Sequence, residues 1–145
     1  MKKLCASLIA IVVLLTASLT GCSFFDRSVK KWDFKHEAKE IEKIQIVEMS
    51  RETSHDYTVI KDIDPSLYET IYSEIQEIDW RWYYFELLSP MGTCFVIHFN
   101  NGDSDIISFV APSHVVYEDD DAYYYTSWLE CDQEEFEALI NKYLN

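Results

Sequence analysis

Four histidines and 26 carboxylates are the side chains with which this chain of 145 residues could carry out acid–base chemistry. Asn101-Gly102 suits a two-residue type I′ turn between two strand-like runs, and such a turn places His98 opposite Asp105. A carboxylate in that position can orient an imidazole, as it does in a nucleophilic triad. No Gly-x-Ser-x-Gly elbow or cysteine-nucleophile motif accompanies the pair, so we favour an ordinary cross-strand contact.

The histidines and cysteines lack the spacing of a metal site. Residues 36–40 resemble the zinc motif HExxH only in their first two positions, because Glu40 stands where the second histidine is required. No two cysteines are spaced as CxxC. The loops at 100–105 and 118–121 contain oxygen ligands, but neither fits the EF-hand pattern, and solvated turns explain both. We expect no metal, no cofactor and no enzymatic activity from the four histidines, which are His36, His55, His98 and His114.

Aromatic side chains are the compositional excess, with 4 Trp, 10 Tyr and 8 Phe. In a strand over residues 80–88, alternation puts rings on both faces, and the same holds at residues 123–125. If helices cover one face of the sheet, rings on the other face suit a protein partner or stacking against sugar. The alternative is that tyrosine, with its polar end, tolerates a half-solvated surface. The candidate binding face consists of Trp82, Tyr83, Tyr123, Tyr124 and Tyr125.

The chain is strongly acidic. All 26 Asp and Glu follow position 21, whereas two of the 12 Lys and Arg precede it, so residues 22–145 carry a formal charge of −16. Beyond Lys61 only Arg81 and Lys142 are basic. A protein that binds the phosphate backbone needs a basic face, so we expect no nucleic-acid partner. The composition favours a basic protein partner, because opposite charge speeds encounter.

The first 22 residues have the layout of a secretory signal. Lysines at positions 2 and 3 precede an apolar stretch over residues 4–19, and small residues follow. The stretch is too short and too interrupted by hydroxyl residues to span a bilayer, which needs about 20 apolar residues. The segment closes on Leu-Thr-Gly-Cys at 19–22, which resembles the lipobox of bacterial lipoproteins.

This resemblance implies that diacylglycerol joins the sulfur of Cys22, that the chain is cut before that residue, and that the new amino terminus can be acylated, for instance with palmitate. It implies a lipid anchor on the extracytoplasmic face of the cell membrane. Ser23 rather than Asp follows the cysteine, which in a cell with two membranes resembles the signal for the outer membrane. Residues 22–40 are then a lipidated tether whose basic side chains lie near the headgroups, and residues 41–145 are one domain.

Two cysteines, Cys94 and Cys131, remain once the signal is removed and Cys22 is lipidated. Export to an oxidising compartment favours a disulfide between them. Many buried cysteines act instead as small apolar residues, so both interpretations stay open.

The hydrophobic pattern predicts an α+β domain in which two helices pack on an antiparallel sheet of about five to seven strands. Strands at 42–49 and 57–61 form a hairpin. A helix at 65–78 follows Asp64, which caps its N–H groups, and starts with Pro65, whose missing N–H costs nothing there. A second helix, at 132–144, follows the cap Asp132. Further strands are expected at 80–88, 93–99, 106–111, 114–117 and 123–129.

These observations together predict a membrane-anchored extracytoplasmic lipoprotein without enzymatic activity. Its acidic charge and aromatic surface favour a binding module for a basic protein, of the inhibitor or immunity type. The alternative is a lipoprotein that binds cell-wall glycan or a small solute, which requires a pocket lined by some of the aromatic residues.

Overall fold

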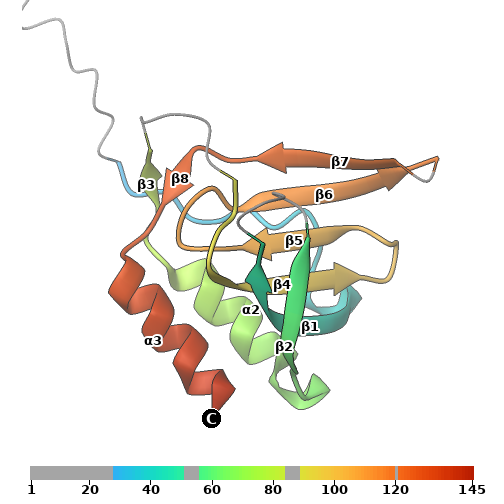
Figure 1. The fold of residues 1–145 in the computed structure, drawn as a ribbon, viewed down its shortest axis with the longest axis horizontal. Helices are drawn as coiled ribbons and strands as arrows, with labels where there is room; N and C mark the ends of the chain where they lie inside the picture. Colours follow the sequence, from blue (N-terminus) through green and yellow to red (C-terminus); the bar gives the residue numbers. More distant parts are fainter. Residues whose placement is uncertain (1–27, 51–55, 84–88, 120) are drawn as a thin grey trace, which may run out of the picture.

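A computed structural model describes residues 28–50, 56–83, 89–119 and 121–145. They form a six-stranded antiparallel sheet, a two-stranded sheet and two α-helices, which confirms the predicted α+β class. The large sheet has the order β2-β1-β4-β5-β6-β7 (Figure 1). Its strands are β1 Ile41–Met49, β2 Tyr57–Asp62, β4 Thr93–Phe99, β5 Ser104–Ile107, β6 Ser113–Glu118 and β7 Asp121–Thr126. The small sheet pairs β3 Arg81–Trp82 with β8 Leu129–Glu130, so the strand predicted at 80–88 is short and residues 84–88 lie outside the described ranges.

Both predicted caps are present, with Asp132 directly before α3 and Asp64 before a 3₁₀ turn that precedes α2, so the α-helix predicted at 65–78 begins only at Tyr68. A 3₁₀ turn, η2 Pro65–Leu67, leads into α2 Tyr68–Glu77, and Oδ1 of Asp64 accepts a hydrogen bond of 2.9 Å from the Ser66 N–H. Helix α3 spans Gln133–Leu144, and Oδ1 of Asp132 accepts from the Glu135 N–H at 2.9 Å. Each carboxylate satisfies an amide that the helix itself leaves unpaired, so the local sequence alone determines where each helix starts.

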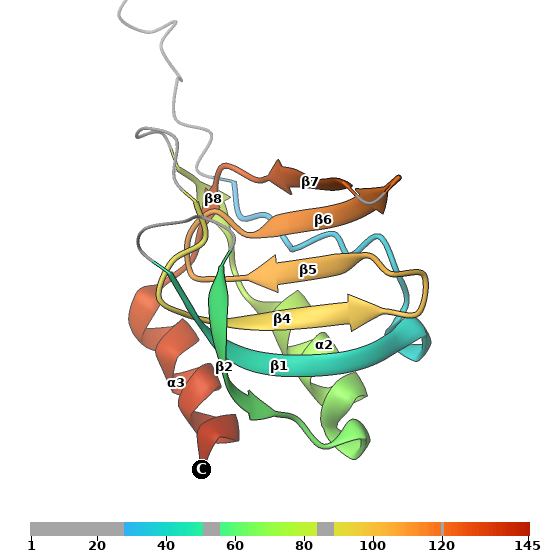
Figure 2. The same ribbon diagram turned by 45° about the vertical axis from the view of Figure 1, so that its right-hand side comes forward.

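Both helices lie against the same face of the large sheet (Figure 2). The core between them is built from large apolar side chains of β1, β4, β5 and the two helices, including Ile44, Ile46, Phe95, Ile97, Ile107, Ile71, Ile75, Phe136 and Ile140. The other face, here called the open face, has a smaller cluster made of Val47, Met49, Cys94, Val96, Ile106 and Val115. The central strands are therefore buried on both sides, although the helices cover only one.

The register between β4 and β5 differs from the predicted one by one position. His98 pairs with Ser104, and Ile97 pairs with Asp105. Since side chains alternate between faces, this shift of one residue moves Asp105 to the face opposite His98. The predicted contact between His98 and Asp105 is therefore wrong.

The cause of the shift is the conformation of the turn. Gly102 has a φ of +93°, and Asn101 is not among the described residues with positive φ. The Phe99 N–H donates to the Asp103 carbonyl and the Gly102 N–H donates to the Phe99 carbonyl, both at 2.9 Å. This is the three-residue loop in which a type I turn is followed by glycine in a left-handed conformation. A type I′ turn would need positive φ at Asn101 as well.

Residues 28–40, predicted to be tether, pack against the domain, so the predicted boundary at residue 41 is too late. Trp32 is buried in the helix-side core, and Phe34 stacks on Tyr72 of α2 with ring centroids 4.2 Å apart. Lys30 and Trp80 exchange two backbone hydrogen bonds of 2.8 and 2.9 Å. The segment ends in a 3₁₀ turn, η1 Ala38–Glu40, that leads into β1. Residues 22–27 of the predicted tether lie outside the described ranges.

The two cysteines belong to different parts of the core. Cys94 is fully buried in the cluster of the open face, whereas Cys131 is half-buried against the helix-side core. Both remain thiols. The disulfide interpretation is therefore wrong for this structure, and the alternative of apolar packing accounts for both residues.

Candidate functional site

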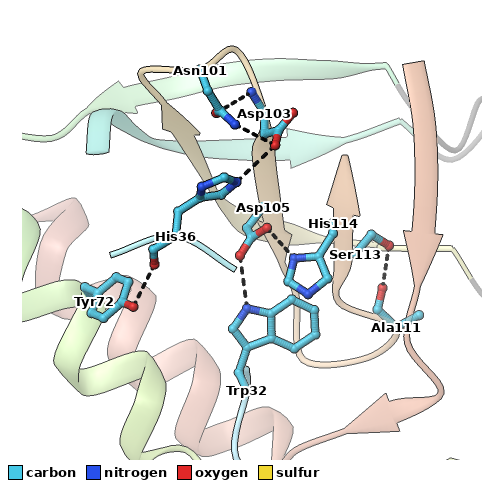
Figure 3. A network of polar contacts seen from close by, with 9 residues as sticks. All are labelled: Trp32, His36, Tyr72, Asn101, Asp103, Asp105, Ala111, Ser113 and His114. Carbon is cyan, nitrogen blue, oxygen red and sulfur yellow. Dashed lines mark hydrogen bonds and ion pairs between the residues drawn. The ribbon is translucent and has the colours of Figure 1, made fainter. Parts of the chain in front are cut away.

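Asp105 is the centre of a buried polar cluster on the helix side of the sheet. Its side chain accepts a hydrogen bond from Nε1 of Trp32 at 3.2 Å and one from Nδ1 of His114 at 2.6 Å (Figure 3). Only 2% of Asp105 is exposed. A carboxylate accepts and never donates, so Nδ1 of His114 is the donor in this bond. The two donors provide the compensation that a buried carboxylate requires.

A second imidazole–carboxylate pair involves His36, which lies four residues after Trp32 in the N-terminal segment. Nε2 of His36 is 3.0 Å from Oδ2 of Asp103, and the His36 carbonyl accepts from the Tyr72 hydroxyl at 2.9 Å (Figure 3). The Asn101 side-chain amide donates to the same Asp103 oxygen at 2.8 Å. Together the two pairs hold residues 32–36 between α2 and the sheet.

The pair of His114 and Asp105 has the geometry of the base and orienting group of a triad, but the hydroxyl next to it in the chain, that of Ser113, points to the other face of the sheet. The ring of Trp32 stacks on His114 with centroids 4.5 Å apart. In the described residues, the neighbouring hydroxyl of Ser113 points to the open face, where it donates to the Ala111 carbonyl and lies 3.0 Å from the Thr126 hydroxyl, from which it can accept. These contacts give the pair a structural role, which is to anchor the N-terminal segment.

His98 lies on the open face in a separate polar group. Its Nδ1 is 2.9 Å from the Ser104 hydroxyl, and its Nε2 is 3.1 Å from Oε1 of Gln45. Burial lowers the pKa of His98, Lys43 lowers it further, and Glu42 acts in the opposite direction. The imidazole is therefore kept neutral as part of the sheet's hydrogen bonding.

The three tyrosines of the candidate binding face that belong to β7 point to opposite sides of the sheet. Tyr123 and Tyr125 are 45% and 53% exposed, whereas Tyr124 points to the open face and packs on its cluster. Tyr125 pairs with His114, so the exposed tyrosines lie on the helix side, next to the N-terminal segment. The ammonium group of Lys35 sits 4.8 Å from the centroid of the Tyr125 ring.

The other predicted aromatics lie in β3 of the small sheet or directly after it, and their partner β8 follows β7 in the chain. Trp82 is 40% exposed and pairs with Leu129, while Tyr83 is half-buried and its N–H donates to the Trp128 carbonyl at 2.9 Å. Trp128 itself is 47% exposed. The sequence analysis missed Trp128 as a surface residue, although it stands at the end of the predicted strand 123–129.

Two tyrosines of the open face, Tyr57 and Tyr117, were also missed, because they belong to strands far apart in sequence from each other and from the predicted Tyr124. Tyr57 of β2 and Tyr117 of β6 are exposed, and Tyr124 of β7 lies partly buried near them. Burial raises the pKa of Tyr57, and the neighbouring Tyr117 raises it further. Burial likewise raises the pKa of Tyr124, with contributions from Tyr117 and Tyr57. The three hydroxyls are therefore near enough on the open face for the charge of one to affect the pKa of another.

Acidic residues surround the hairpin end of the β7 strand. Glu118, Asp119 and Asp121 are exposed there, and Asp119 takes a φ of +50°. No lysine or arginine occurs between Arg81 and Lys142 in the sequence. Tyr123, near the hairpin, therefore lies beside negative charge, whereas Tyr125 has Lys35 over its ring.

Two pockets lined by described residues lie away from these aromatics. One, of about 290 Å³, lies between α3 and β4 and is lined in part by Phe109, Phe136 and Ile140. The other, of about 380 Å³, is lined mainly by charged residues, namely Asp79, Arg81, Glu130, Asp132 and Glu135. Neither contains the exposed rings of the candidate binding face.

Comparisons with protein-family models, curated proteins and solved structures give no match for the chain. Within the described ranges, no helix is long and apolar enough to cross a membrane. The same residues contain no group of three or more His, Cys, Asp or Glu arranged to hold a metal ion.

Proposed function

We propose that the protein is a lipid-anchored extracytoplasmic binding module, without enzymatic activity, that takes a basic protein partner of the inhibitor or immunity type. The observation that carries the proposal is the surface of β7, where Tyr123 and Tyr125 are exposed beside Glu118, Asp119 and Asp121. Aromatic rings supply binding energy at protein interfaces, and the acidic surroundings favour lysine and arginine on the partner.

The contact between Lys35 and Tyr125 supports this chemistry within the chain itself. A cation already lies over the exposed ring at 4.8 Å, a distance typical of a cation–π interaction. The second exposed ring, Tyr123, is two residues away on the same face. It offers a partner's lysine or arginine an equivalent position.

The alternative, a lipoprotein that binds cell-wall glycan, draws support from the exposed indoles of Trp82 and Trp128, since such rings stack on sugars. Among the described residues, neither of the two pockets is lined by these rings, and both indoles are exposed. A glycan would therefore bind on an open surface.

Capture from the native cell envelope, followed by binding measurements on the purified partner, tests the proposal. We expect a basic protein whose association rate falls with added salt, since screening shortens from about 10 Å at 0.1 M to about 3 Å at 1 M. Tyr123→Ser combined with Tyr125→Ser should weaken binding, whereas Tyr57→Ser, which alters a tyrosine of β2, should not. An acidic partner, or an association rate indifferent to salt, contradicts the proposal, and retention of purified glycan favours the alternative.

The lipid anchor is tested separately. We expect the mass of the mature chain to show diacylglycerol on Cys22, and Cys22→Ala to abolish the modification. Mature wild-type protein with an unmodified Cys22 would contradict the anchor without affecting the binding proposal.

A further inference from the structure

The pocket of about 290 Å³ between α3 and β4 combines an apolar floor with acidic walls. Its floor contains Phe136 and Ile140, which belong to the helix-side core, and Phe109, which packs against that core. Two carboxylates line the same pocket, Glu48 of β1 and Glu137 of α3, and both are exposed. Buried apolar groups below exposed negative charge suit a ligand with an apolar stem and a cationic end.

A neighbouring side chain orients each of the two carboxylates. Thr93, which pairs with Glu48 across the sheet, donates through Oγ1 to Oε2 of Glu48 at 2.8 Å. Nε2 of Gln133 donates to Oε1 of Glu137 at 2.7 Å, one turn away on α3. Within the described ranges, no lysine or arginine forms an ion pair with either carboxylate. Each group therefore has capacity to accept from a bound cation.

The lysines adjacent to the pocket are engaged with other groups. Lys142, in the last turn of α3, pairs with Glu74 of α2. Lys61 donates to the carbonyl group of Leu144, a residue that lines the pocket, at 3.2 Å. None of the described residues in the lining is itself basic. The described part of the chain thus supplies two carboxylates and no cation to this pocket.

The larger pocket, of about 380 Å³, is a poorer site for a cation, although four carboxylates line it. Asp132 caps α3, and Glu130 stands opposite Arg81 in the small sheet. Lys31 donates to Asp79 at 2.8 Å. Three of the four carboxylates therefore already have a role within the chain, and Arg81 in the lining repels a further cation.

We infer that the pocket between α3 and β4 is the binding site for a lysine side chain of the basic partner. This inference rests on the proposed function, since that partner supplies the lysine, and it adds a contact apart from the tyrosines of β7. The methylene groups of the lysine lie along Phe109 and Phe136, and its ammonium group donates to Glu48 and Glu137. Gly92 leaves room for this stem, because a side chain at its position would begin 3.9 Å from the Phe109 ring.

The hydrogen bonds of the two carboxylates favour lysine over arginine. A guanidinium group binds most strongly when both oxygens of one carboxylate face it. Here one oxygen of Glu48 and one of Glu137 already accept from a neighbour. An ammonium group is a compact charge with three donors, so it can use a single oxygen from each carboxylate.

NMR titration of the mature chain with capped lysine, Nα-acetyl-lysine amide, tests the site. We expect a Kd on the order of 1 mM, as for a ligand of this size, with shifts at the amides of Gly92 and Asn141 in the lining. Capped norleucine keeps the stem without the ammonium group and should bind about tenfold more weakly. Capped arginine should also bind more weakly than capped lysine.

Two variants remove the charges of the pocket and keep its hydrogen bonds. Glu48→Gln and Glu137→Gln should each weaken binding of capped lysine about threefold, as expected for exposed ion pairs. Glu134→Gln is the matched control, because it makes the same change of charge at an exposed position of α3 that does not line the pocket. Its effect should stay within about 1.5-fold.

Several outcomes overturn the inference. One is capped lysine that leaves Gly92 and Asn141 unshifted, and another is equal binding by the wild type and all three variants. Arg51 follows Glu48 by three positions and lies outside the described ranges. If Arg51→Gln tightens binding of capped lysine about tenfold, the chain's own arginine is the occupant. Pentylammonium that binds about tenfold more tightly than capped lysine would assign the pocket to a free amine.

The purified partner connects the pocket to the proposed function. Glu48→Gln combined with Glu137→Gln should weaken binding of the partner about tenfold, which is the product of the two single effects. Partner binding that the double variant leaves unchanged overturns the lysine site. The proposed function is decided separately, by the charge of the captured partner and by the serine variants of the β7 tyrosines, which do not line this pocket.

Discussion

Nδ1 of His114 lies 2.6 Å from Oδ1 of Asp105, on the helix side of two neighbouring strands, with the ring of Trp32 stacked on the imidazole. This contact joins the N-terminal segment to the middle of the sheet, because Trp32 donates to the second oxygen of the same carboxylate. The stability of the domain should therefore depend on one buried acid that the predicted register places on the wrong face.

Asp105→Ala should lower the free energy of unfolding by about 3 kcal/mol, because the donors of Trp32 and His114 lose their acceptor in a buried site. For a domain of about 120 residues the melting temperature should fall by roughly 10–15 °C. Thermal unfolding followed by circular dichroism measures the change. Asp33→Asn is the matched control, since Asp33 is exposed on the same segment and should change stability by about 0.5 kcal/mol at most. Equal effects of the two substitutions would refute the role assigned to Asp105.

Trp32→Ala should cost about 3–5 kcal/mol, as expected for a large aromatic removed from a core. Val29→Ala, at a residue 48% exposed, is the control and should be nearly neutral. Urea unfolding of both variants checks the comparison. A chain that begins at residue 41 should unfold at lower urea concentration than one that begins at residue 28. If both chains are equally stable, residues 28–40 are a tether after all.

The helices could be predicted because their determinants are local. Asp64 and Asp132 cap the turns that immediately follow them, and the apolar side chains recur at helical spacing. The class of fold follows from the same local patterns. The position of Asp105 could not be predicted this way, because the pair Asn101-Gly102 is compatible with two turn lengths. Only packing in three dimensions selects between them.

The N-terminal segment, in contrast, carries a sequence pattern that was overlooked. Charged residues occupy positions 31, 33, 35, 37 and 39, and the intervening positions contain Trp32, Phe34, His36 and Ala38. Such alternation indicates an extended segment with one buried side, and the burial of residues 31–39 follows it. The polar network among residues distant in sequence, such as His36 and Asp103, had no comparable signal.

Gly102→Ala should lower stability by about 1–2 kcal/mol, because alanine resists the positive φ of this turn. No atom lies within 4 Å of the added Cβ, so the cost comes from the backbone alone. Asn101→Gly distinguishes the observed turn from the type I′ alternative. In the observed turn it should cost about 0.5–1 kcal/mol, whereas in a type I′ turn it would be neutral or stabilising. Chemical denaturation of the three proteins provides the comparison.

Alkylation should find two thiols and no disulfide in a chain that begins at residue 23. Burial is the main reason that the pKa of Cys94 and that of Cys131 are both raised to about 12. At pH 8 both groups are therefore thiols, which react slowly. We expect little labelling of the native protein and two labels per chain after denaturation without reductant, as counted by mass spectrometry. Labelling that appears only after reduction would demonstrate the disulfide.

Stability should fall as the pH drops below about 6.5, and His98 should contribute to this fall. Its folded-state pKa is lowered, chiefly by burial, so the unfolded chain binds a proton at a higher pH than the folded one. By linkage, the contribution of His98 to stability is fully present above its unfolded-state pKa. It is lost as the pH falls through the folded-state pKa. His98→Gln removes this contribution while retaining a polar side chain beside Ser104 and Gln45. Urea titration at pH 7.5 and pH 5 measures the unfolding free energy of both proteins. Between these pH values the wild type should lose more unfolding free energy than the variant. A difference that does not change with pH would show that His98 titrates alike in both states.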